Sequence, residues 1–127
     1  MPMIRALALS LSTTLLLSGV VSAEETPPPQ MPPKQTLLEK SVELSSNKLK
    51  TQVFRIVLPK GFKTPQHIHD GPGPRYVVKG RVKVEEGGQT QEYGPGQVFW
   101  ESGAVMTAEN VSDGEAELLI FEIAAQP

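Results

Sequence analysis

The chain contains two histidines, His67 and His69, separated by a single residue. Side chains on a β-strand alternate between its two faces, so a His-x-His pair on a strand points to one side. Two neutral imidazoles placed in this way can share one metal ion, because each ring offers one nitrogen lone pair. An isolated pair is more typical of two surface or hydrogen-bonded histidines, so the metal interpretation depends on the surrounding sequence.

The sequence lacks the residues that most other kinds of reactive site require. It has no cysteine, which excludes disulfides, thiol chemistry and cysteine-based zinc sites. Because both histidines fall in one short segment, a Ser-His-Asp arrangement is not indicated. The glycines of residues 71–74 alternate with prolines, which lack the N–H groups that cradle a phosphate. A net charge of −2 without a basic stripe gives no reason to expect a nucleic-acid partner.

The first residues have the pattern of an export signal. Arg5 is the only charged residue before Glu24, and an apolar run follows it. The small residues Val21 and Ala23 suit cleavage after Ala23, so residues 1–23 are predicted to be a signal peptide. A membrane anchor is the alternative, but serines and threonines interrupt the run before it reaches about 20 apolar residues. The sequence therefore predicts a periplasmic or secreted protein whose mature chain is not inserted in the membrane.

Residues 24–35 contain five prolines and are predicted to form an exposed spacer. Residues 36–127 are predicted to form one β-domain, because short runs of Val, Ile and Phe are broken by glycine turns. The expected strands lie at residues 51–58, 75–78, 81–85, 98–100 and 117–123, and a strand is favoured over a helix for 37–46. Seven to nine short antiparallel strands require a sandwich or barrel that limits exposed edges, so the fold class is all-β.

The surroundings of the histidine pair resemble the first conserved motif of the cupin superfamily. Five residues separate Gly61 from His67, three separate His69 from Gly73, and six separate Gly73 from Gly80. These are the spacings of the motif, in which Gly73 occupies the position of a glutamate. The small single-domain cupins of the type-2 group are the closest resemblance.

The second cupin motif is matched in part. Counting back from Asn110 places Met106 at the position of the motif histidine, Gly103 at its glycine and Glu101 at its proline. Gly96, the candidate for the first glycine of the motif, is then one residue too close to Glu101. The resemblance covers about residues 50–123, and it implies a double-stranded β-helix, or jelly-roll barrel, that is often dimeric and holds any site inside.

The resemblance also implies a metal held by three histidines and a glutamate, of which only His67 and His69 carry over. Gly73 has no ligating side chain, and Met106 offers a soft thioether. Two imidazoles and a thioether would suit copper better than a hard ion, although Met106 can simply fill apolar space. Asp70 would reach the ion only if the strand breaks there. The predicted cofactor is a divalent transition metal or copper.

A second interpretation concerns a ligand pocket formed by Arg75, Tyr76 and Trp100. Arg75 has the same strand parity as Gly73, so its side chain can enter the barrel if the register holds. The missing carboxylate would leave the guanidinium without a partner charge, and with the two histidines it would attract a small anion. The alternative is a solvated Arg75, and aromatic side chains that belong to the barrel core.

Three functions follow as hypotheses. The first is a secreted or periplasmic cupin-domain protein that binds a metal ion or small ligand through His67 and His69. The second is a metal-dependent enzyme of the dioxygenase, isomerase or lyase type with an incomplete ligand set. The third is a non-catalytic homodimeric interaction domain in which residues 117–123 build the interface. Whether the protein is an enzyme stays open at this stage.

Overall fold

The computed structural model describes residues 19–25 and 30–126. The chain divides into two compact units, Met1–Pro33 and Lys34–Pro127. The described residues of the first unit form neither helix nor strand. Most of the predicted signal peptide lies outside the described residues, so it stays a prediction. Within the described ranges, no helix is long and apolar enough to cross a membrane.

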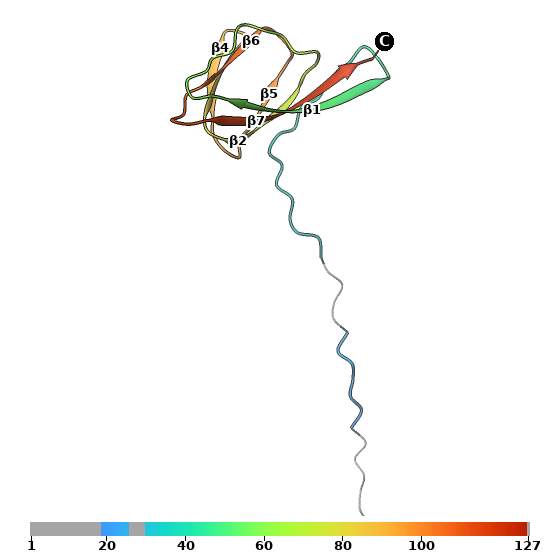
Figure 1. Ribbon diagram of the computed structural model, residues 1–127. Coiled ribbons are helices and arrows are strands. Elements are labelled where there is room, and N and C mark those ends of the chain that lie inside the picture. The colour runs from blue at the N-terminus through green and yellow to red at the C-terminus, as the bar shows by residue number, and fades with distance from the viewer. Residues whose placement is uncertain (1–18, 26–29, 127) are drawn as a thin grey trace, which may run out of the picture. The chain divides into compact units, whose positions relative to one another are not determined.

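The second unit is built from β-strands, which confirms the predicted all-β class (Figure 1). All strand pairs in it are antiparallel. The strands are β1 (Leu49–Leu58), β2 (Gly73–Lys79), β3 (Val82–Glu86), β4 (Gln89–Tyr93), β5 (Val98–Glu101), β6 (Met106–Asn110) and β7 (Ala116–Ala125).

The first sheet has the strand order β1-β7-β2-β5. β1 and β7 pair along their whole length, from Leu49 opposite Ala125 to Leu58 opposite Ala116. One end of this pair extends beyond the neighbouring strands (Figure 1). β7 lies between β1 and β2, so the edge strands of this sheet are β1 and β5. The homodimer, and the part that residues 117–123 would take in its interface, stay predictions.

The second sheet has the order β4-β3-β6, and the loop between β1 and β2 runs along its β6 edge. Lys63 bridges to Glu109, and His67 bridges to Met106. The two sheets enclose one apolar core. Its buried members are Leu58, Val77, Val82, Val84, Phe99, Met106, Ala108, Ala116 and Leu118. The β3–β4 turn uses Gly87 and Gly88 at φ angles of 59° and 75°, as the glycine pair predicts.

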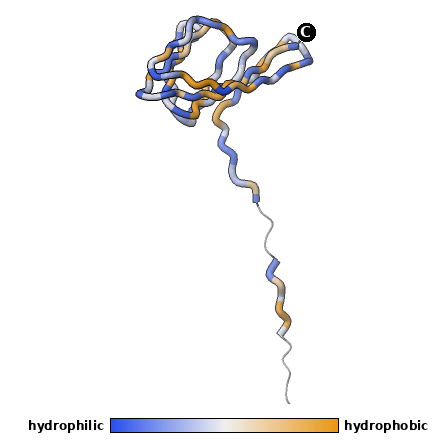
Figure 2. Tube along the Cα trace, in the orientation of Figure 1, coloured by the Kyte–Doolittle hydropathy of each residue, from blue (hydrophilic) through white to orange (hydrophobic). Residues whose placement is uncertain are grey.

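The prediction of a strand at residues 37–46 is wrong. This segment forms neither strand nor helix. Its leucines instead line a pocket with Tyr76, Trp100 and Leu119. Leu37 and Leu38 remain 53% and 36% exposed in this pocket, so these apolar residues line a surface pocket and do not pair in a strand. Figure 2 shows other hydrophobic stretches along the paired strands of the barrel.

Candidate functional site

The histidine pair lies on the loop between β1 and β2, beside β6. His67 and Met106 exchange two backbone hydrogen bonds, of 3.1 and 2.9 Å. Directly opposed residues of an antiparallel pair point to the same side, and Met106 is only 2% exposed in the core, so His67 faces the barrel interior. The segment is not a regular strand at His69, yet the two ring centres are only 5.0 Å apart.

In both histidines, Nδ1 of the ring lies within hydrogen-bonding distance of an acceptor oxygen. Nδ1 of His67 lies 2.9 Å from the carbonyl oxygen of Pro65. Nδ1 of His69 is hydrogen-bonded to the carboxylate of Glu122. An acceptor at Nδ1 favours the tautomer with its proton there, which in His67 leaves the Nε2 lone pair for a ligand. In His69, Nε2 also faces a carboxylate oxygen, Oε2 of Glu101, at 3.2 Å. His67 is therefore held as metal-binding histidines commonly are, and His69 lies between two carboxylates.

A buried ionic network surrounds His69. Nε2 of His69 lies 3.2 Å from Oε2 of Glu101, and Nε of Arg75 donates a 2.8 Å hydrogen bond to the same oxygen. Nη2 of Arg75 is 3.8 Å from Oε1 of Glu122. Arg75 is 0% exposed, Glu101 3% and Glu122 5%. These groups come from β2, β5, β7 and the histidine loop, so the network ties the first sheet to the site.

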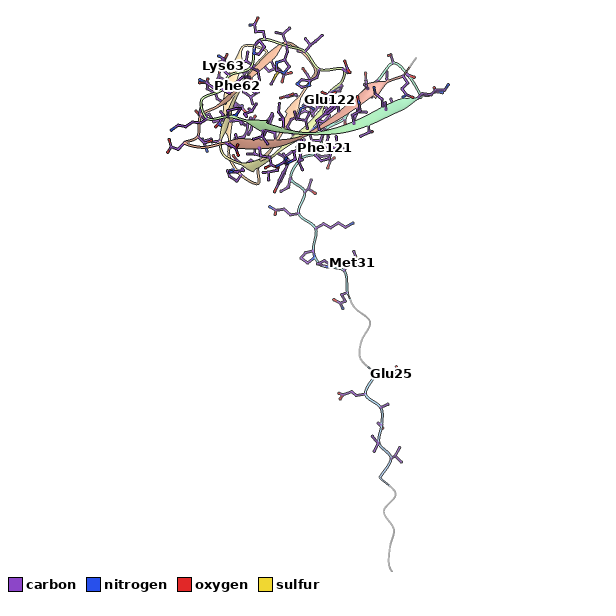
Figure 3. The ribbon with its side chains drawn as sticks, in the orientation of Figure 1. Glu25, Met31, Phe62, Lys63, Phe121 and Glu122 are labelled. Carbon is purple, nitrogen blue, oxygen red and sulfur yellow. The ribbon has the colours of Figure 1, made fainter. Side chains whose placement is uncertain are left out.

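Arg75 is anchored by backbone as well as by carboxylates. Its Nη1 donates 2.8 Å hydrogen bonds to the carbonyl oxygens of Gly73 and Phe121. Its Nη2 is buried without a hydrogen-bond partner among the described residues. Phe121 and Glu122 occupy opposite sides of β7 (Figure 3), in accord with strand alternation.

Burial raises the pKa of Glu101 above the ordinary value of 4.5, although Arg75 and His69 oppose the rise. The folded state therefore binds a proton more tightly than the unfolded state does. Stability contributed by this group is fully present below the ordinary value and is lost as the pH rises through the raised pKa.

The Glu101→Gln variant tests this effect, because glutamine cannot ionise. We expect the melting temperature of the wild type to fall relative to that of the variant as the pH is raised above 4.5. The comparison is made in the presence of a chelator, by circular dichroism across the acid and neutral range. Ion pairs elsewhere titrate in both proteins and cancel in the difference. Parallel pH profiles would contradict the raised pKa.

The predicted ligand pocket needs a correction. The premise that Arg75 lacks a partner charge is wrong, because Glu101 and Glu122 neutralise it. Tyr76 and Trp100 are half-buried and line, with residues 35–42, a separate pocket of about 650 Å³. Arg75 also contributes to the lining of that pocket, but its guanidinium is turned into the barrel network. Ligand binding in the pocket stays a prediction.

The remaining candidates are Met106 and Asp70. Met106 is packed in the apolar core, which agrees with the space-filling alternative, and its role as a ligand stays a prediction. Asp70 lines a pocket of about 450 Å³ together with His69, Glu122 and Ile68. This pocket gives the His69 side of the site an opening to solvent.

Glu122 was missed by the sequence reasoning, and Glu101 was noted only for its position in the motif. A signal for Glu122 was present, since it has the same parity as Leu118 and Ile120. An acidic residue at an inward position of an otherwise apolar strand indicates a buried partner. In the described part of the chain, no three His, Asp or Glu side chains already form a cluster with the arrangement of a metal site.

A comparison with protein-family models agrees with this geometry. The cupin-domain model matches residues 54–122, which is more than half of the chain. The chain belongs to the cupin family. The match spans both sheets and contains the histidine pair, Arg75, Glu101 and Glu122.

Solved structures support the same fold. A predicted oxalate decarboxylase from Thermotoga maritima is 25% identical with a TM-score of 0.50; the match covers 58% of this cupin and 65% of that chain, so less than two thirds of the relative is spanned. An RmlC-like cupin with a double-stranded β-helix fold from Methanocaldococcus jannaschii is 20% identical, with a TM-score of 0.50, and the match covers 67% and 86% of the two chains. No curated protein matches this cupin.

Proposed function

We propose that this protein is an exported cupin that binds a transition-metal ion inside the barrel through Nε2 of His67 and His69. The observation that carries the proposal is that both imidazole rings are held in the same way and lie close together. Each has Nδ1 at an acceptor, and the ring centres are 5.0 Å apart. Two imidazoles that share one ion through bonds of about 2.1 Å have ring centres about 5 Å apart.

The carboxylate next to His69 supports the same proposal. An acceptor such as Glu122 at Nδ1 orients a ligating imidazole and increases the basicity of its other nitrogen. Glu122 is only 5% exposed, so it is shielded from solvent and fixed in place. The backbone carbonyl of Pro65 does the same for His67.

The family's usual four-ligand set does not fit this chain as a whole. A side chain at position 73 would overlap the carbonyl oxygen of Phe121, so the usual acidic ligand is sterically excluded there. Met106 stands where the third histidine would be, within the apolar core. The two histidines fit a metal and the rest of the usual set does not. A bound ion would supply a Lewis-acidic or redox centre.

Metal-dependent catalysis is the second candidate function. The pocket of about 450 Å³ at His69 favours it, because a small substrate could reach the site from solvent. The relative from Thermotoga maritima is described as a predicted oxalate decarboxylase. Oxalate is therefore the first substrate to test with metal-loaded protein.

Elemental analysis tests the proposed function. The full chain is expressed, purified without chelator or affinity tag, and compared with the His67→Ala/His69→Ala variant. We expect about one equivalent of a transition metal in the wild type and a loss of at least tenfold in the variant, since both nitrogen ligands are removed. Lys63→Ala, an exposed change on the same loop, is the control and should retain the metal.

Absence of metal in the wild type, even after incubation with Zn²⁺, Co²⁺, Ni²⁺ and Cu²⁺, would contradict the proposal. Equal metal in the wild type and the double variant would contradict it as well. Circular dichroism of each variant shows whether a loss of metal reflects a loss of fold.

A further inference from the structure

We propose that Glu101 supplies the carboxylate ligand that the cupin motif places at position 73. This inference rests on the proposed metal site at His67 and His69. It assigns a ligand role on β5 to a residue that the family pattern does not use, and it assigns Arg75 the role of holding that ligand.

Position 73 cannot carry the ligand itself. A Cβ atom there would overlap the carbonyl oxygen of Phe121 on β7 and would lie 3.1 Å from Nη1 of Arg75. Arg75 folds back over this position and bonds the carbonyl oxygen of Gly73. The carbonyl group of Phe121 and the guanidinium of Arg75 therefore occupy the space that a glutamate side chain at position 73 would need.

Glu101 is the direct cross-strand partner of Gly73. Directly opposed residues of an antiparallel pair share a face, with Cβ positions about 5 Å apart. A carboxylate at 101 therefore approaches the same part of the barrel as one at 73 would, from the neighbouring strand. The contact of 3.2 Å between Oε2 of Glu101 and Nε2 of His69 agrees with this placement.

Hydrogen bonding and burial hold the carboxylate of Glu101 in place. The side chain is 4% exposed, and its hydrogen bond from Nε of Arg75 falls on Oε2. His69 approaches the same oxygen, which leaves Oε1 for another partner. Among the described residues, no three His, Asp or Glu side chains are already arranged to hold a metal ion, so the proposed site requires these side chains to rearrange when an ion binds.

The absence of cysteine from the chain permits a direct spectroscopic test. Glu101→Cys introduces the only thiol, and a thiolate bound to Co²⁺ gives an intense charge-transfer absorption in the near ultraviolet. We expect this absorption when Co²⁺ is added to Glu101→Cys. We expect none for Glu109→Cys, whose thiol would lie at a partly exposed position on β6 beside Lys83. Absence of the band in folded Glu101→Cys that still binds Co²⁺ would overturn the inference.

A titration with Co²⁺, followed by its visible absorption, gives the second measurement. Loss of an oriented outer-shell group costs about 10–100-fold in metal affinity, and loss of a charged ligand should cost at least as much. We therefore expect Glu101→Gln to weaken Co²⁺ binding by on the order of 100-fold and Glu109→Gln to leave it unchanged. Equal affinity and an unchanged spectrum in Glu101→Gln would overturn the inference while the proposed function stands.

The outcomes separate the two proposals. A wild type that binds no Co²⁺ overturns the proposed function and this inference with it. If Glu101→Gln or Glu101→Cys fails to fold, the substitution is combined with Arg75→Met, which removes the unpaired buried guanidinium. The combined Glu101→Cys/Arg75→Met variant must then show the thiolate band with Co²⁺, and its absence counts against the inference.

Discussion

Replacing Arg75 by methionine should lower the free energy of unfolding by about 3–5 kcal/mol, which is typical when one partner of a buried ion pair is removed. The guanidinium is 0% exposed and contacts Glu101 and Glu122, which are 3% and 5% exposed. Methionine has a similar length, so the loss reports mainly the two carboxylates left without a cation. Urea denaturation at neutral pH with a chelator measures the change.

Arg55→Met is the matched control for this prediction. Arg55 also pairs with a glutamate, Glu117, but its side chain is 63% exposed. Exposed ion pairs contribute about 0–1 kcal/mol because water screens them. Combining Arg75→Met with Glu101→Gln should recover part of the loss, since one unpaired charge is removed. Similar small losses for Arg55→Met and Arg75→Met would contradict a buried ionic network in the barrel.

Replacing Gly73 by alanine should destabilise the protein by about 3 kcal/mol or more, at the upper end of overpacking costs. The added methyl group would overlap the carbonyl oxygen of Phe121, a backbone atom of the paired strand β7. Relief requires strands β2 and β7 to move apart, because no flexible side chain can yield instead. Thermal or urea unfolding measures the effect.

Gly114→Ala provides the control for the glycine substitution. A Cβ at Gly114 meets nothing within 4 Å, and Gly114 does not adopt a positive φ. Alanine there should be neutral or should stabilise by up to about 1 kcal/mol, because it restricts the unfolded chain. Equal stability of Gly73→Ala and Gly114→Ala would show that position 73 can accept a side chain, and the steric exclusion of the family ligand would be wrong.

The strands were predictable where apolar residues alternate with polar ones or form a short continuous run between turns. Residues 51–58 and 117–123 lie within β1 and β7, and residues 81–85 nearly coincide with β3. Their patterns are local, so no knowledge of pairing is needed. Residues 37–46 were assigned wrongly because they contain apolar residues without a backbone partner, and apolar content alone does not distinguish a strand from a segment packed on a sheet.

The histidine pair was predictable because it lies within one short segment. The rest of the site was not, because Arg75, Glu101 and Glu122 converge from three strands. Their meeting depends on register, with Gly73 opposite Glu101 and Arg75 opposite Ile120, and register is not a local property of the sequence. Arg75 was therefore expected to lack a partner charge. In the structure, Glu101 and Glu122, which are distant in sequence, supply that charge.

Anomalous diffraction from crystals grown with Co²⁺ tests the metal site most directly. Data on either side of the cobalt absorption edge locate the ion independently of any assumption about its ligands. We predict one strong peak inside the barrel within bonding distance of Nε2 of His67, Nε2 of His69 and a carboxylate oxygen of Glu101. A barrel without a peak, or a peak held by other residues while the two histidines keep their present contacts, would contradict the proposed site.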